Sequence, residues 1–342
     1  MEKAKGRLFQ NLRESRSLLM GIAIIGIAFY HAPFILHNQW VLLWKSALNW
    51  GVDLFLFLSG LGACHSIKQR GGMGYLRQRA ARLLPGLYLF LLPWCVVMMA
   101  LGAMGLRQCL GAVTLLGWWL GEPMQLNWYF SAVWMFFLLA IPCYRLFCRT
   151  KHPVGLWLVL VGVSIGIGIL CPFPWLMTAV TRLPVFLTGM LFGRLEQLDF
   201  RHEGRLRGIV LLLLPAGLWL VIITYLGYGY VYGYSLGLWW YPYALVIPGG
   251  AVLISDLAAA LRKRTVLSRL MRPIEWCGES SAEILMVHVG IYKIINTVTR
   301  FRNRYWAMIC LGCLVLGCGY HYLVTARLSG RKLHRKTTGR GT

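Results

Sequence analysis

Four ionisable side chains interrupt apolar segments that are long enough to cross a membrane. In chain order they are His31, Asp53, Glu283 and His288. An ionisable group near the centre of a bilayer is costly unless it faces a cavity or a partner. Side chains kept in such places are therefore the first candidates for chemistry.

His31 and Asp53 have the residue types and depths of a general base and its orienting acid. His31 lies about 20 Å of helical rise into the segment that starts at Leu18, and Asp53 opens the returning segment. A carboxylate that accepts a hydrogen bond from one imidazole nitrogen leaves the other nitrogen ready to take a proton. The alternative is that the two side chains only hold helices together, and it applies equally to Glu283 and His288.

Arginines form a second group of candidates. Arg77, Arg79 and Arg82 lie in the stretch YLRQRAARLLP, which leads into another apolar segment. Guanidinium groups bind phosphates, so this stretch is a candidate site for a phosphate-bearing donor; the alternative is contact with lipid headgroups. Arg182 stands at the outer end of a predicted membrane segment, where the positive-inside rule requires no cation. It could pair with a substrate carboxylate or with Asp53, or its side chain could extend to the interface.

The composition places these residues in a membrane protein. Hydrophobic residues make up 58% of the 342 positions, charged residues make up 13%, and the mean hydropathy is +0.61. Apolar segments of about 20 residues recur along nearly the whole chain, which fits helices that cross a hydrocarbon layer of about 30 Å. We therefore predict an all-α, polytopic integral membrane protein.

About ten transmembrane helices are predicted. They cover residues 18–36, 48–67, 84–104, 126–147, 154–171, 179–197, 207–226, 236–257, 277–298 and 305–325. The segment 110–121 is apolar but too short to cross, so we expect an interfacial or re-entrant helix there. The helices form one membrane domain over residues 18–326, between basic cytoplasmic tails at 1–17 and 327–342.

The net charge of +24 raises the question of a nucleic-acid partner. With the amino terminus inside, 28 of the 35 basic residues fall in inner segments, as the positive-inside rule requires. One group opposes the rule, and it consists of Lys293, Arg300, Arg302 and Arg304. We therefore expect both termini in the cytoplasm, contacts with membrane lipids and no nucleic-acid partner.

Motifs for a metal or a nucleotide are absent from the sequence. Cys310 and Cys313 form a single C-x-x-C without a second pair, so no metal site is expected. There is no glycine-rich nucleotide loop, no His-Glu-x-x-His motif and no Gly-x-Ser-x-Gly elbow. No internal repeat marks matched halves of a transporter, which weighs against transport.

Six stretches stand in a characteristic order and spacing. They are LLMGIAIIGIAFYHA, GVDLFLFLSG, RQRAARLLP, NWYFSAVWMFFLLAIP, TRLPVFLTGMLFG and CGESSAEILMVHVGIY. Together, over about residues 16–325, they resemble the acyltransferase-3 family of bacterial membrane O-acyltransferases. The resemblance implies a ten-helix membrane enzyme that takes an acyl group, commonly acetyl from acetyl-CoA on the cytoplasmic side, and places it on a hydroxyl of a sugar or lipid-linked glycan.

The same resemblance implies roles for the candidate residues. His31 matches the essential histidine of the family and is expected to be catalytic together with Asp53. Arg79 and Arg82 match the arginine motif and are expected to bind the acyl-CoA co-substrate. The residues expected to bind substrate are Arg182, Glu283 and His288.

One position departs from the family pattern. Members usually carry a basic residue eleven positions before the histidine, where this chain has Met20. Arg16, about one helical turn further along, is expected to substitute for it in binding the donor.

We therefore predict an O-acyltransferase of the cell inner (plasma) membrane that moves an acyl group, acetyl in the first instance, to a cell-envelope or exported polysaccharide or glycolipid. One alternative is a transporter or flippase for a glycan or lipid, in which the same charges line a pathway. Another is a membrane module that only senses or scaffolds. Two routes from a cytoplasmic donor to His31 stay open: a reach of the acyl arm into a pore, or a relay of the acyl group.

Overall fold

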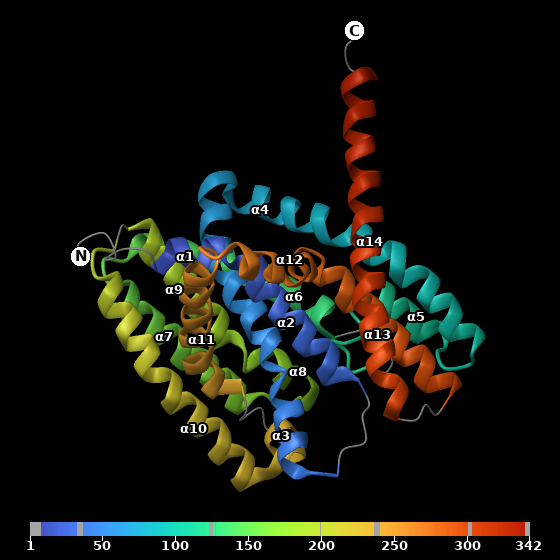
Figure 1. The fold of residues 1–342 in the computed structure, drawn as a ribbon, viewed down its shortest axis with the longest axis horizontal. Helices are drawn as coiled ribbons and strands as arrows, with labels where there is room; N and C mark the ends of the chain where they lie inside the picture. Colours follow the sequence, from blue (N-terminus) through green and yellow to red (C-terminus); the bar gives the residue numbers. More distant parts are fainter. Residues whose placement is uncertain are drawn as a thin grey trace.

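The fold is all-α in every residue that the computed structural model describes, which are residues 8–32, 37–122, 126, 128–198, 200–235, 240–299 and 303–338 (Figure 1). In chain order the helices are α1 (Leu8–Glu14), α2 (Arg16–His31), α3 (Gln39–Ala47), α4 (Trp50–Ala100), α5 (Leu106–Val113), α6 (Trp128–Arg149), α7 (Pro153–Leu170), α8 (Pro174–Val180), α9 (Leu183–Gln197), α10 (Glu203–Ser235), α11 (Trp240–Leu261), α12 (Thr265–Glu279), α13 (Ser281–Val298) and α14 (Asn303–Thr338).

The outer surface of the bundle is apolar. Among the described residues, seven helices are long and apolar enough to cross a membrane. Leu170 of α7 is 82% exposed and Leu212 of α10 is 75% exposed. Soluble proteins rarely expose apolar surface on this scale, whereas lipid tails are as apolar as leucine and cover it readily. The chain is therefore a polytopic membrane protein.

The difference between the ten predicted spans and these seven helices has three causes. The spans predicted at 48–67 and 84–104 both belong to α4, because the segment between them is helical as well. Helix α2 has only 16 residues, and the predicted residues 33–36 lie outside the described residues. Helix α13, with several polar side chains, is not among the seven. The segment 110–121 forms the end of α5 and a series of turns, so it does not cross as a helix.

Two elements lie across one end of the bundle, while most long helices run side by side (Figure 1). They are the middle part of α4 and helix α12, and α1 begins and α14 ends at this same end. Within α4 the helical geometry is interrupted at Gly71, whose φ of 68° and ψ of 171° are accessible almost only to glycine. The arginine-bearing stretch of α4 directly follows this kink.

Helices α4 and α9 touch backbone to backbone through small residues. A Cβ atom placed on Gly189 of α9 would lie 2.1 Å from the carbonyl oxygen of Phe57, and one on Gly60 of α4 would lie 2.3 Å from that of Phe186. Small residues at a helix crossing allow this approach in membranes. The contact fixes the start of α4, which carries Asp53, relative to the start of α9.

Candidate active site

Two histidines from different helices contact each other where α2 ends. Nδ1 of His31 lies 3.0 Å from Nε2 of His288 in α13. Nδ1 of His288 lies 2.7 Å from the carbonyl oxygen of Ile284, which can only accept a hydrogen bond. In a neutral pair, Nδ1 of His288 therefore donates to Ile284, and its Nε2 accepts from Nδ1 of His31. This arrangement leaves Nε2 of His31 with a free lone pair.

Asp53 does not contact His31, so the expected hydrogen bond between them is wrong. Oδ2 of Asp53 accepts a hydrogen bond from Nε of Arg182 at 3.3 Å, and both side chains are fully buried. Position along a helix predicts the depth of a residue but not which neighbour its side chain meets. A buried carboxylate is also stabilised more by a guanidinium than by a neutral imidazole. His288 takes the place beside His31 that Asp53 was expected to hold.

Arg182 is held on several sides. It stands between α8 and α9, within a stretch predicted as one span, and it donates to the carbonyl oxygen of Thr178 and to Oδ1 of Asn49 at 3.3 Å. Its guanidinium carbon lies 3.9 Å from the ring centroid of Trp240 and 5.1 Å from that of Trp128, both within cation–π range. The cation is therefore anchored inside the protein rather than extended to the interface.

A cavity of about 200 Å³ lies beside His31, and we call it the histidine cavity. Its lining is mixed, with apolar side chains and a few convergent polar groups, as in sites that bind small molecules. The lining side chains that carry a polar atom are Tyr30, His31, Asn49, Trp128, Tyr129 and Arg182. His288 adjoins this cavity through its contact with His31.

A second cavity, of about 210 Å³, contains three arginines, and we call it the arginine cavity. Arg16 donates to the carbonyl oxygen of Leu58 at 2.8 Å, and its charge is within electrostatic range of Arg79 and Arg82. The guanidinium carbon of Arg79 lies 5.2 Å from the ring centroid of Tyr75. Three like charges held together in one cavity are stabilised by a bound anion, and guanidinium groups match phosphate geometry.

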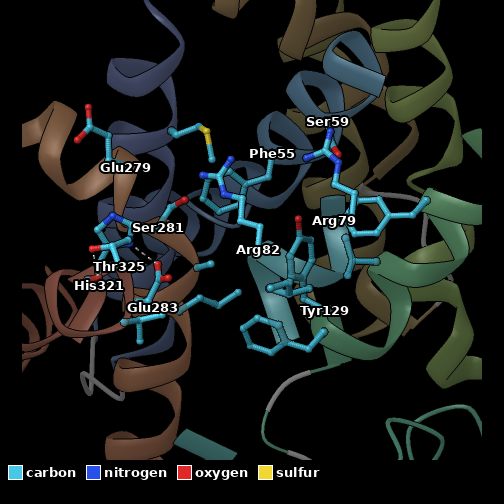
Figure 2. Close-up of a pocket in the computed structure, with 18 of the residues that line it drawn as sticks. Phe55, Ser59, Arg79, Arg82, Tyr129, Glu279, Ser281, Glu283, His321 and Thr325 are labelled. Atoms are coloured by element: carbon cyan, nitrogen blue, oxygen red, sulfur yellow. Dashed lines mark hydrogen bonds and ion pairs between the residues drawn. The ribbon is translucent and has the colours of Figure 1, made fainter. Parts of the chain in front are cut away.

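The opposite side of the arginine cavity carries acids and hydroxyl groups. Figure 2 shows Arg79 and Tyr129 on one side of the cavity, and on the other side Glu279, Ser281, Glu283, His321 and Thr325. Nδ1 of His321 in α14 lies 3.2 Å from Oε2 of Glu283 in α13. In the part of the chain that the structure describes, no group of three His, Cys, Asp or Glu side chains is placed to hold a metal ion.

His321 is a site residue that the sequence reasoning missed. It is an ionisable residue inside the apolar run predicted to span at 305–325, so the rule that singled out His31 applies to it as well. Tyr129 was likewise missed as a site residue, although it lies in one of the six quoted stretches.

The arginine cavity and the histidine cavity share one wall. Phe55, Tyr129 and Leu285 line both of them. The fold thus brings the predicted residues together in two adjoining groups. Those in the arginine cavity are Arg16, Arg79, Arg82 and Glu283, and those at or beside the histidine cavity are His31, Arg182 and His288, with Asp53 behind Arg182.

The position of Met20 clarifies the departure from the family pattern. Met20 and Arg16 both line the arginine cavity. A basic side chain at position 20 would face the same space, and the guanidinium of Arg16 reaches it from about one helical turn away.

An apolar helical bundle with adjoining cationic and histidine-containing cavities defines a polytopic membrane protein with internal cavities lined by ionisable side chains. The model of the acyltransferase 3 family, described as an acyltransferase domain, matches residues 17–324, and the chain belongs to this family. It is a membrane acyltransferase, which implies an acyl donor and an acceptor. No curated protein and no solved structure shows significant similarity to the chain.

Proposed function

We propose that the protein is an O-acyltransferase of the cell inner membrane. It moves an acyl group, acetyl in the simplest case, from acyl-CoA to a hydroxyl of a cell-envelope or exported polysaccharide or glycolipid. The observation that carries the proposal is the pair of adjoining cavities, one with three guanidinium groups and the other with an imidazole that has a free nitrogen. Family membership supplies acyl transfer as the reaction.

The donor binds at the arginine cavity on the cytoplasmic side. Arg16, Arg79 and Arg82 hold the phosphates of coenzyme A through charge-assisted hydrogen bonds. The described chain begins and ends at the end of the bundle where the arginine stretch of α4 lies, which agrees with cytoplasmic termini and an inner side rich in basic residues (Figure 1).

The acyl arm of the donor reaches towards His31 through the wall shared by the two cavities. It passes Phe55, Tyr129 and Leu285, which line both spaces, so it crosses one layer of side chains rather than the whole bundle. This favours a direct reach over a relay of the acyl group through an intermediate carrier.

His31 acts as the general base in the histidine cavity. Its Nε2 takes the proton of the acceptor hydroxyl while the hydroxyl oxygen attacks the carbonyl carbon of the thioester. The new carbon–oxygen bond forms, the carbon–sulfur bond breaks, and the proton passes from His31 to the leaving thiolate. His288 is a positioning residue, because it holds His31 in the tautomer that leaves Nε2 free.

Arg182 and Asp53 support the acceptor side of the site. Arg182 lines the histidine cavity and is proposed to contact the acceptor, while Asp53 fixes its side chain and balances its charge. Asp53 therefore acts through Arg182 rather than through His31. Glu283, with His321, belongs to the donor side, since both line the arginine cavity.

The test of His31 uses purified protein in lipid vesicles with radiolabelled acetyl-CoA and envelope glycans from cells that lack the protein. We expect label on the glycan with the wild type and about 100- to 10,000-fold less with His31→Ala, the range of general-base catalysis. His37→Ala is the matched control, because His37 is exposed and does not line either cavity. Equal transfer by His31→Ala and the wild type would remove His31 from the mechanism.

The test of the donor site compares two arginines of the same stretch. Arg79 lines the arginine cavity, whereas Arg77 is exposed and does not. We expect Arg79→Ala to raise the KM for acetyl-CoA about tenfold or more, since a charged hydrogen bond is lost, and Arg77→Ala to leave it unchanged. Equal effects of the two would refute the donor assignment. Glycan binding without transfer by the wild type would favour the transporter alternative.

A further inference from the structure

Asn49 carries a side-chain amide that the proposed reaction does not use. It precedes α4 as the N-cap residue, and it lines the histidine cavity together with His31. An asparagine at an N-cap usually accepts a hydrogen bond from the first backbone N–H groups of its helix. The side chain of Asn49 makes no such bond. It is directed towards Arg182 instead, whose guanidinium donates to its Oδ1 atom.

The orientation of this amide is fixed by Arg182. A guanidinium has no acceptor atom, so the oxygen of the amide must face Arg182 and its Nδ2 group must face elsewhere. Arg182 is in turn held by Asp53 and by the carbonyl oxygen of Thr178, so each of its three guanidinium nitrogens has an acceptor. The amide of Asn49 cannot turn over without losing its bond to this network.

The Nδ2 group of Asn49 is available to a molecule in the histidine cavity. Within the described ranges of the chain, the structure gives Nδ2 no hydrogen-bond partner, although Asn49 is only 6% exposed. Nδ2 is also not among the described side-chain atoms that are sealed inside the protein without a partner. Because Asn49 lines the histidine cavity, its N–H bonds can reach a bound acceptor atom there. A buried donor left without a partner is unfavourable, so this amide indicates a ligand.

We propose that Nδ2 of Asn49 donates a hydrogen bond to the carbonyl oxygen of the thioester and stabilises the oxyanion that forms there. The inference rests on the proposed function and adds a catalytic residue to the same site. When the acceptor hydroxyl attacks, one electron pair of the carbonyl bond moves to its oxygen. When the carbonyl bond forms again, the thiolate leaves and takes the proton from His31. A prearranged donor stabilises the charged oxygen more than the neutral carbonyl, and this lowers the barrier.

The carbonyl oxygen suits this donor better than the acceptor hydroxyl does. The hydroxyl gives its proton to Nε2 of His31 and uses a lone pair for the attack, which a hydrogen bond to its oxygen would weaken. Arg182 strengthens the donor, because a guanidinium bonded to Oδ1 polarises the amide. The first turn of α4, with Val52, lines the same cavity, and the positive end of a helix dipole favours negative charge.

The first experiment separates the two ends of the amide. Asn49→Asp keeps an oxygen for Arg182 but has no N–H to donate, whereas Asn49→Ala removes both groups. We expect each variant to lower kcat for transfer from radiolabelled acetyl-CoA to envelope glycans by about 100- to 1,000-fold, with the KM for acetyl-CoA unchanged. If Asn49 only supports Arg182, Asn49→Asp should regain the wild-type kcat, and that result overturns the proposal.

The second experiment changes the atom that accepts the hydrogen bond. The donor is the dithioester analogue of acetyl-CoA, in which sulfur, a weak acceptor, replaces the carbonyl oxygen. With this donor the wild type has little to gain from the amide, so we expect its advantage over Asn49→Ala to shrink to less than about tenfold. An equal loss with both donors means that the substitution acts through packing or through Arg182, and it overturns the proposal. If Asn49→Ala does not fold, the same comparison is made with Asn49→Asp.

Asn38→Ala is the matched control. Asn38 is exposed, accepts hydrogen bonds from backbone N–H groups at the start of α3, and lines neither cavity. Its kcat should equal that of the wild type, and a loss as large as that of Asn49→Ala contradicts the inference. Absence of any transfer by the wild type refutes the proposed function itself, whereas transfer that does not depend on Asn49 refutes only the inference.

Discussion

His288→Ala tests the histidine pair more directly than removal of His31 does. The substitution leaves the Nδ1–H of His31 without the acceptor that now lies 3.0 Å away. An unsatisfied polar group in a largely buried site costs about 1–3 kcal/mol, which corresponds to about a 5- to 150-fold smaller population of the productive tautomer. We expect kcat to fall by that factor while the KM for acetyl-CoA stays unchanged, because His288 does not line the arginine cavity.

The matched variants separate orientation from packing. In His288→Gln the amide oxygen can still accept from Nδ1 of His31, so most of the rate should return. Tyr292 lies in α13, as His288 does, and its hydroxyl donates a weak hydrogen bond of 3.4 Å to the carbonyl oxygen of Ala28 in α2. Tyr292→Phe removes this bond and leaves the contact between His31 and His288 in place, so the variant should behave as the wild type. The assay is the initial rate of label transfer in vesicles at saturating glycan. An unchanged kcat in His288→Ala, or an equal loss in His288→Gln, would refute the tautomer argument.

Three further outcomes are expected. Leu285→Trp adds bulk to the wall shared by the two cavities and should lower kcat at least tenfold; unimpaired transfer would contradict the route between the cavities. Asp53→Asn leaves Arg182 buried without its counter-charge and should lower the free energy of unfolding by about 3–5 kcal/mol. The measurement is thermal unfolding in detergent, and an unchanged unfolding temperature would count against the ion pair. Gly189→Ala forces α4 and α9 apart and should cost about 1–3 kcal/mol or more, whereas Gly166→Ala, with open space around it, should not.

The sequence predicted which residues are unusual better than it predicted which residues meet. The cost of an ionisable group in hydrocarbon does not depend on knowing the packing, so His31 and His288 were singled out and the structure brings them together. The expected partner of His31 was wrong because depth along a helix is readable from sequence, whereas the azimuth of Asp53 relative to its neighbours is not.

Features of the site that consist of apolar residues could not be predicted from the sequence. Phe55 and Leu285 belong to the wall between the cavities, yet in the sequence they are ordinary members of apolar runs. The helical geometry of the segment between the two apolar parts of α4 was missed for a related reason, because charged residues between two apolar segments are typical of a loop and equally of a helix lying at the interface. Gly71, which interrupts α4, gave no distinct signal among the many glycines.

The side chains that the two cavities share also bear on how the membrane stays insulating. An open, hydrated path between the two ends of the bundle would let protons leak down the transmembrane voltage. Phe55, Tyr129 and Leu285 line both cavities and place two aromatic rings and a branched alkyl group where they adjoin, and apolar constrictions of this kind oppose the entry of water. On the proposed route the acyl group passes this apolar wall, and the same wall opposes a leak of protons down the electrochemical gradient.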